Sequence, residues 1–296
     1  MALNTPTTQS VRLGALFGLL AAGSYGINPP LARLAYEAGL SSATLVSVRS
    51  VVMLVGTALL VTVWRVRISF PPGAGWPVLV LGLSTAILSV SYLTSVIFIP
   101  VSLAVIIFYT FPILILTISV ISGRERSSFK RWLIVAGVFA GLSLVIGPKF
   151  SGLDWRGVAL AGISSLCAVA QFYSGAAATA RMDLRAIVFW VHVITLPVVG
   201  LALAFSGVSM PTDAVVAWGA VAVASLGYVA GFFFQLFSLT RISPAASSLY
   251  FNAEPLVTLG IAVLLLGETL SALQITGAAM VISGLIASSL VNSGTK

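Results

Sequence analysis

The chain has 296 residues, of which 59% are hydrophobic and 7% are charged. An ordinary soluble domain carries about 25% charged residues, so this composition excludes a water-soluble globule. The net charge of +8 does not indicate a nucleic-acid partner, because the basic residues form no run longer than a pair such as Lys130 and Arg131.

Ten apolar stretches follow one another along the chain, and each is close to the roughly 20 residues that a helix needs to span a bilayer. They lie at 12–33, 43–64, 76–98, 101–122, 129–147, 156–179, 185–206, 214–239, 244–266 and 270–291. Runs such as 51–63 do not alternate between apolar and polar positions, which excludes a transmembrane β-barrel. The sequence therefore predicts an all-α membrane protein. Its first helix is retained, because its apolar run ends in Asn28-Pro29-Pro30 rather than at a small-residue cleavage site.

The two halves of the chain are related by an internal duplication. When the sequence is laid along itself without gaps, so that position 78 meets position 221, identical residues recur throughout 78–144. Phe108 then meets Phe251, and Pro112 meets Pro255. Each half holds five predicted helices, and an odd number makes the second half enter the membrane with the opposite orientation. We therefore expect two inverted five-helix repeats, at 1–148 and 149–296.

Loop charges predict the orientation of the chain, since cytoplasmic loops are enriched in Lys and Arg. Of the 15 basic residues, 11 fall in segments on the side of the N-terminus: Arg12, Arg65, Arg67, Arg124, Arg126, Lys130, Arg131, Arg181, Arg185, Arg241 and Lys296. Three fall on the other side, Arg33, Lys149 and Arg156, and Arg49 lies within the second helix. Both termini are therefore predicted to be cytoplasmic, in a multi-pass protein of the cell membrane.

A paired signature carries a family resemblance: a Pro within a helix precedes a Glu at the next loop by the same spacing in both halves, at Pro112 to Glu125 and at Pro255 to Glu268. With the second-repeat sequence EPLVTLGIAVLLLGETLSALQITGAAMVISG, the chain resembles the drug/metabolite transporter superfamily, specifically its EamA-type ten-helix exporters. The first repeat departs from the family pattern, with Gly123-Arg124-Glu125 where Gly and Glu are usually adjacent. A closer likeness is to the YddG-type exporters, which favour aromatic amino acids.

Inverted-repeat transporters place their substrate near the bilayer midplane, often beside interrupted helices. Pro112 and Pro255 each remove a backbone hydrogen bond, so they are predicted as hinges for alternating access, with a static kink as the alternative. Glu254 is the carboxylate placed well inside a predicted helix. It is either a proton-coupling and binding residue in a wet cavity or a neutral acid that caps the broken helix.

Polar and aromatic side chains at helical spacing predict a cavity for a small amphipathic molecule. The predicted substrate-binding residues are Asn28, Tyr92, Gln171, Tyr228, Phe232, Gln235, Ser247, Tyr250 and Glu254. Interhelical hydrogen bonds explain the amides equally well, and core or lipid contact explains a single aromatic. Arg49 and His192 are repeat mates; a snorkelling Arg and a structural His are the favoured interpretations, with proton coupling by His192 as the alternative.

The predicted function is a secondary transporter that exports small metabolites, above all amino acids including aromatic ones. A multidrug or nucleotide-sugar carrier is the alternative, and an intramembrane enzyme is disfavoured, because Gly-x-Ser motifs recur near chance in this sequence. No phosphate-binding motif, cysteine cluster or histidine-rich motif is present, so no cofactor or metal is expected. The expected partners are a small-molecule substrate and the lipid bilayer, and the expected state is a monomer or a weak homodimer.

Overall fold

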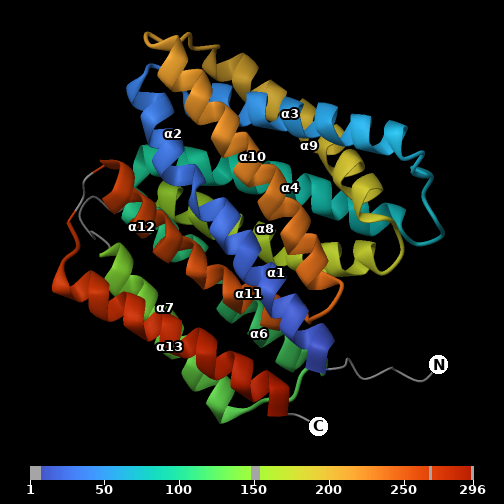
Figure 1. Cartoon of the computed structure of the whole chain (residues 1–296), viewed down its shortest axis with the longest axis vertical. Helices are drawn as coiled ribbons and strands as arrows, with labels where there is room; N and C mark the ends of the chain where they lie inside the picture. Colours follow the sequence, from blue (N-terminus) through green and yellow to red (C-terminus); the bar gives the residue numbers. More distant parts are fainter. Residues whose placement is uncertain (1–7, 148–153, 267–268, 295–296) are drawn as a thin grey trace.

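The computed structural model describes residues 8–147, 154–266 and 269–294. Glu268 of the paired signature, Lys149 and Lys296 of the charge pattern and the predicted repeat boundary at 148–149 lie wholly or partly outside these residues. Within the described part of the chain, ten helical segments are long and apolar enough to cross a membrane. This confirms the predicted all-α fold (Figure 1).

The ten spans follow the predicted order, and three of them are built from more than one helical element. The elements are α1 (Thr8–Gly26), α2 (Asn28–Glu37), α3 (Ser42–Val63), α4 (Gly75–Phe98), α5 (Val101–Phe108), α6 (Phe111–Ile121), α7 (Phe129–Ile146), α8 (Trp155–Thr179), α9 (Leu184–Ser206), α10 (Ala214–Leu239), α11 (Pro244–Tyr250), the 3-10 turn η1 (Phe251–Ala253), α12 (Glu254–Leu266) and α13 (Ala272–Gly294).

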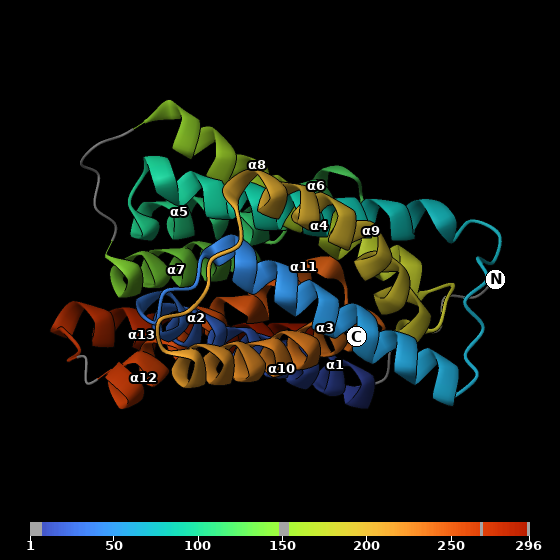
Figure 2. The same cartoon turned by 90° about the horizontal axis from the view of Figure 1, so that it is seen from above.

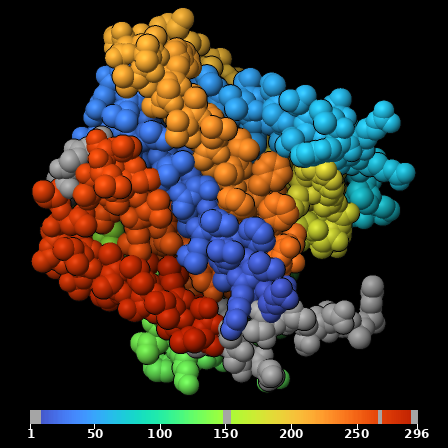
Figure 3. Space-filling view, in the orientation of Figure 1, coloured from blue at the N-terminus to red at the C-terminus, as the bar shows by residue number. Residues whose placement is uncertain are grey.

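The spans pack in pairs that join the two halves of the chain. Helix α4 lies against α8, α3 against α9, α1 against α10 and α7 against α13. In Figure 2, α4 and α8 lie on one side of the bundle and α1 and α10 on the other, with α11 between them. In the space-filling view, α1 runs across the front between α10 and the last two spans (Figure 3). Every pair combines one helix from each half, so neither half packs as a separate body.

Equivalent glycines allow equivalent helix contacts in the two halves. A Cβ atom added at Gly14 would lie 2.6 Å from Cγ2 of Ile242, and one added at Gly157 would lie 2.8 Å from Cγ2 of Ile99. In the ungapped alignment of the two halves, Gly14 meets Gly157 and Ile99 meets Ile242. Small residues let helix backbones approach closely in membranes, so the duplicated sequence yields a duplicated α1–α10 and α4–α8 contact.

Two details of the predicted helices are wrong. The first span, predicted over 12–33, is not one continuous helix: it breaks at Ile27 and continues as α2 to Glu37. Pro112 and Pro255 do not sit in the middle of continuous helices, because each is the second residue of a new helix, α6 or α12. Pro is tolerated in the first turn of a helix, where its missing N–H has no intrahelical partner.

Capping side chains fix where several spans begin. Asp213 Oδ1 accepts from the backbone N–H of Val216 at 3.1 Å, and Ser41 Oγ accepts from that of Thr44 at 3.2 Å. Asp183 caps α9, and its hydrogen bonds from Arg185 lower the pKa of this carboxyl. Such caps satisfy backbone donors that the first turn leaves free.

Candidate functional site

The first span is interrupted because two successive prolines free two carbonyls of the preceding turn. Pro29 and Pro30 have no N–H to donate to the carbonyls of Tyr25 and Gly26. The side-chain amide of Asn28 replaces the first missing donor, with Nδ2 3.0 Å from the Tyr25 carbonyl oxygen. A buried carbonyl left without a donor costs about 1–3 kcal/mol, so Asn28 stabilises the break.

The second freed carbonyl is satisfied by the ninth span. Thr258 Oγ1 donates to the Gly26 carbonyl at 2.9 Å, and a Cβ atom at Gly26 would lie 2.8 Å from the Glu254 carbonyl oxygen. The rings of Tyr25 and Phe251 lie 5.9 Å apart. The interruptions of the first and ninth spans therefore meet inside the bundle, although they belong to opposite halves of the chain.

The fourth span is interrupted at the equivalent place and contacts the same region. Between α5 and α6, Thr110 Oγ1 donates to the Ile107 carbonyl at 2.7 Å and lies 2.9 Å from Ser165 Oγ on α8. The hydroxyl of Tyr109, the residue before Thr110, interacts with the Glu254 carboxyl. Three broken spans thus surround Glu254.

Arg49 approaches this region from α3. The guanidinium carbon of Arg49 lies 4.1 Å from the centroid of the Tyr228 ring, within the range of a cation–π interaction. Arg49 also interacts electrostatically with Tyr25 and Tyr36. Its guanidinium points onto aromatic side chains of the bundle, so the structure contradicts the interpretation of Arg49 as an arginine that snorkels into its loop.

Five of the predicted binding residues keep partial solvent exposure within the spans. They are Asn28, Tyr92, Gln171, Tyr228 and Glu254. Tyr228 packs on Arg49, and the ring of Tyr92 lies 5.6 Å from that of Phe108 in the fourth span. Gln171 donates from Nε2 to Thr85 Oγ1 at 2.8 Å, a bond that links α8 to α4. The protein therefore does not fully enclose these five side chains.

The four other predicted binding residues are packed among the helices. Phe232, Gln235, Ser247 and Tyr250 are at most 5% exposed. Gln235 Oε1 accepts from the Tyr25 hydroxyl at 3.1 Å, and Ser247 Oγ lies 2.8 Å from Ser238 Oγ. The break between α11 and α12 also separates Ser247 and Tyr250 from Glu254, which the sequence pattern placed on one continuous helical face. In this structure these four side chains hold the spans together.

His192, on α9, packs against the Tyr228 ring and is fully buried. Its Nδ1 atom lies 2.8 Å from the Val188 carbonyl oxygen, and its Nε2 atom lies 3.3 Å from the Tyr228 hydroxyl. Because a carbonyl only accepts, the proton of a neutral ring belongs on Nδ1, and the Tyr228 hydroxyl donates to Nε2. His192 thereby fixes the hydroxyl of the tyrosine on which Arg49 rests.

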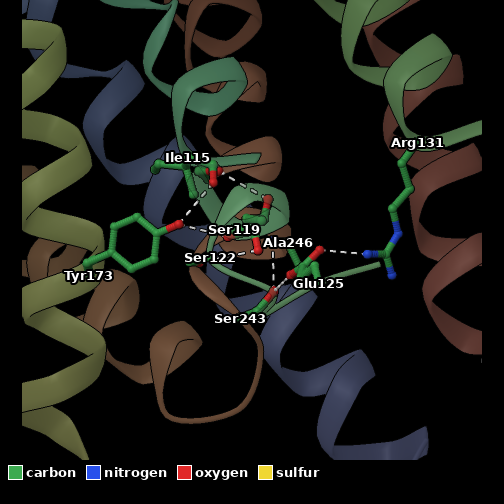
Figure 4. A network of polar contacts seen from close by, with 10 residues as sticks. Ile115, Ser119, Ser122, Glu125, Arg131, Tyr173, Ser243 and Ala246 are labelled. Atoms are coloured by element: carbon green, nitrogen blue, oxygen red, sulfur yellow. Dashed lines mark hydrogen bonds and ion pairs between the residues drawn. The ribbon is translucent and has the colours of Figure 1, made fainter. Parts of the chain in front are cut away.

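A polar network lies at the end of the bundle where α1 begins (Figure 4). Glu125, in the α6–α7 loop, pairs with Arg131 Nη1 at 2.6 Å and accepts a hydrogen bond from Ser243 Oγ at the start of α11. Tyr173 on α8 donates to the Ile115 carbonyl of α6 at 3.0 Å. The network joins the two halves of the chain at this end.

The opposite end of the bundle has its own contact between the halves. The backbone N–H of Thr212 donates to the Ala38 carbonyl at 2.9 Å, and Thr212 Oγ1 donates to the same oxygen at 3.1 Å. Tyr36, which precedes this contact on α2 and interacts with Arg49, is 38% exposed.

Sequence patterns did not select Tyr25, Tyr109 and Thr258 as site residues. Tyr109 lies on the fourth span, where only Pro112 was selected, and Thr258 lies on the ninth span, where the selected residues end at Pro255. A usable signal exists for Tyr25, since it lies one helical turn before Pro29 and its carbonyl must lose its helical donor. In the described part of the chain, no three His, Cys, Asp or Glu side chains are grouped as metal ligands.

A comparison with protein families finds two matching regions in this chain. The sequence matches the EamA-like transporter family twice, over residues 12–147 and 155–290. The first positions of the two matches, 12 and 155, also meet in the ungapped alignment of the two halves. The family matches therefore coincide with the internal duplication.

Two curated relatives are named threonine/homoserine exporter RhtA. The one from Escherichia coli strain K12 is 25% identical over 227 residues, covering 77% of this chain and 75% of the relative. The one from Salmonella typhimurium strain LT2 is 24% identical over the same length. These relatives do not specifically support the narrower likeness to YddG-type exporters. A solved structure described only as a crystal structure of a protein has a TM-score of 0.76 and 19% identity, covering 94% of this chain and 96% of that one.

Proposed function

The chain belongs to the EamA-like transporter family, and from this premise we propose that it exports amino acids across the cell membrane by alternating access. The family is one of transporters, so the chain is a membrane transporter and not an intramembrane enzyme. Its similarity to threonine/homoserine exporters over 77% of the chain supports an amino-acid substrate.

The observation that carries the proposal is the meeting of three broken spans around Glu254. Interrupted helices expose backbone and side-chain polar groups at the depth where inverted-repeat transporters bind their substrates. Tyr92 and Tyr228 add flat surfaces suited to the apolar part of an amino acid, including an aromatic one. Pseudo-equivalent breaks in the fourth and ninth spans allow the two halves to exchange conformations, as alternating access requires.

Transport by the purified chain in proteoliposomes tests the proposal. Vesicles loaded with labelled L-threonine, L-homoserine or L-phenylalanine should lose label faster than protein-free vesicles, and excess unlabelled amino acid should compete. A labelled nucleotide sugar and a cationic dye serve as substrates of the alternative carriers. If either of these crosses while none of the amino acids does, the amino-acid proposal is wrong.

We also propose that both termini are cytoplasmic and that the second repeat is inverted. The test uses a Cys167→Ala background, to remove the native thiol, and adds one cysteine at a time. Met210 is 79% exposed in the α9–α10 loop, so Met210→Cys should react with an impermeant maleimide added to intact cells. Arg126→Cys, in the exposed α6–α7 loop, should react only after permeabilisation. The reverse pattern would contradict the proposed orientation.

The hinge proposal for Pro112 and Pro255 yields a separate prediction. Alanine at Pro112 supplies an N–H that can bond to the carbonyl of Phe108 and let α5 and α6 merge into one helix. We expect the double variant Pro112→Ala/Pro255→Ala to lower turnover at least about tenfold while the yield of folded protein falls little. Pro197→Ala, inside the continuous helix α9, is the control and should keep most of its turnover. Full transport by the double variant would reduce both prolines to packing residues.

A further inference from the structure

Two opposite charges inside the spans have no ion-pair partner among the described residues: Arg49 on α3 and Glu254 at the start of α12. The other described carboxylates are either paired with an arginine, as in Glu37, Glu125, Asp154 and Asp183, or cap a helix, as in Asp213. A charge near the bilayer centre costs about 2.5–3.5 kcal/mol on insertion scales. Each of these charges therefore has to be compensated, by an opposite charge, by a proton on the carboxylate or by contacts with neighbouring groups.

Arg49 is held by an aromatic ring rather than by acceptors. Its guanidinium lies over Tyr228, and its Nε atom is buried without a hydrogen-bond acceptor in the described part of the structure. A guanidinium presents its donors in a planar fork that matches both oxygens of a carboxylate. Stacking on Tyr228, itself fixed by His192, orients the fork without using its donors.

No ion pair joins Glu254 to Arg49 in the described structure, and aromatic rings connect the surroundings of the two residues. The Tyr25 ring lies 6.0 Å from that of Tyr228, on which Arg49 rests, and 5.9 Å from that of Phe251, three residues before Glu254. Arg49 and Glu254 both keep partial solvent exposure. A row of aromatic rings therefore links the surroundings of the two charged groups.

Asn28 adds an unused acceptor on the break that contacts Glu254. The Nδ2 atom of Asn28 is occupied by the Tyr25 carbonyl, whereas its Oδ1 atom is buried without a partner among the described residues. A buried acceptor in this state is stabilised by a donor from a bound molecule. An ammonium group offers three donors and no acceptor, so it fits both Asn28 Oδ1 and the Glu254 carboxylate.

On the basis of the proposed function, we infer that Arg49 binds the α-carboxylate and Glu254 the α-ammonium group of one zwitterionic amino acid. A zwitterion compensates both charges at once and brings no net charge into the membrane. A simple amine or a simple acid leaves one of the two protein charges uncompensated. The site therefore selects for free α-amino and α-carboxyl groups, and the tyrosines between them contact the substrate's side chain.

The experiment measures binding to the purified full-length chain by thermal shift, and transport by counterflow in proteoliposomes. The probes are L-threonine, its methyl ester, which lacks the carboxylate, and N-acetyl-L-threonine, which lacks the ammonium group. With the wild type, both analogues should bind at least about tenfold more weakly than L-threonine. L-homoserine and L-phenylalanine, each tested with its own ester, extend the same comparison to other side chains.

Arg49→Gln should weaken L-threonine binding about 30-fold or more, the loss expected when one partner of a buried, hydrogen-bonded charge pair is removed. Binding of the methyl ester should stay unchanged, so the variant should no longer distinguish amino acid from ester. Arg67→Gln, at an exposed loop position, is the matched control and should behave as the wild type. Arg49→Lys keeps the positive charge but lacks the planar guanidinium group. It should fold even if Arg49→Gln does not, and it should still distinguish L-threonine from its methyl ester in part.

The outcomes separate this inference from the proposed function. If amino acids bind and cross the membrane but the wild type accepts their esters equally well, the inference is wrong and amino-acid export stands. The same holds if Arg49→Gln and Arg49→Lys keep the full discrimination of the wild type. If none of the three amino acids binds or crosses, the amino-acid proposal and the inference both fail.

Discussion

Replacement of Glu254 by glutamine is expected to abolish the dependence of export on the pH gradient and to lower transport driven by that gradient at least about tenfold. The carboxylate has no cation partner among the described residues and lies where three broken spans meet. Its charge must be neutralised before the site crosses the membrane, either by a proton or by the ammonium group of the substrate. Glutamine keeps the shape and most hydrogen bonds but cannot take up a proton.

The measurement is efflux of labelled amino acid from proteoliposomes at several external pH values. Protons entering from an acidic outside should drive the amino acid out, and the rate should rise as the outside becomes more acidic. Glu37→Gln is the matched control, because Glu37 forms an exposed pair with Arg33 near the end of its span and should keep the response. Equal export with and without a gradient by the wild type would make the protein a facilitator driven by the gradient of its substrate.

The second large effect is expected at Gly277, where α13 crosses α7 in direct backbone contact. A Cβ atom at this position would overlap the carbonyl oxygen of Gly141 and lie 2.8 Å from both Cβ of Leu144 and the backbone nitrogen of Val145. Backbone atoms of a membrane helix cannot move aside without breaking helical hydrogen bonds. Gly277→Leu should therefore separate the two helices and lower the free energy of unfolding by about 3 kcal/mol.

Gly137 provides the control for this prediction on the same helix, α7. A Cβ atom added there meets no other atom within 4 Å, so Gly137→Leu should change stability little. Thermal unfolding of both variants in detergent, followed by size-exclusion chromatography, gives the comparison. If Gly137→Leu destabilises the chain as much as Gly277→Leu, the loss does not come from the α7–α13 contact, because leucine favours a helix more than glycine does.

The sequence by itself determined the number of spans and their approximate limits. In lipid, each helix must satisfy its backbone hydrogen bonds within its own segment, so a run of about 20 apolar residues specifies a span without reference to its neighbours. The duplication was equally readable, because an ungapped comparison of the chain with itself is enough to bring Pro112 opposite Pro255. These two prolines also indicated two of the spans that break, because a proline lacks the backbone N–H of a helix at its own position.

Tertiary structure alone decided how the first span continues past Pro29 and Pro30. The Gly26 carbonyl that Pro30 leaves free is satisfied by Thr258, a residue of the ninth span, and no local pattern encodes that partner. The sequence predicted one stretch over 12–33 and did not specify this contact between distant spans.

The surroundings of Arg49 were likewise decided by distant residues. One turn or two from its loop, an arginine is expected to extend toward water. Here Tyr228 of the eighth span lies 4.1 Å from its guanidinium carbon, and His192 of the seventh span holds the hydroxyl of that ring. Some polar residues face the interior and others only join helices, and contacts between spans decide which. The reason is that a polar side chain in a membrane forms hydrogen bonds with the groups that helix packing places next to it.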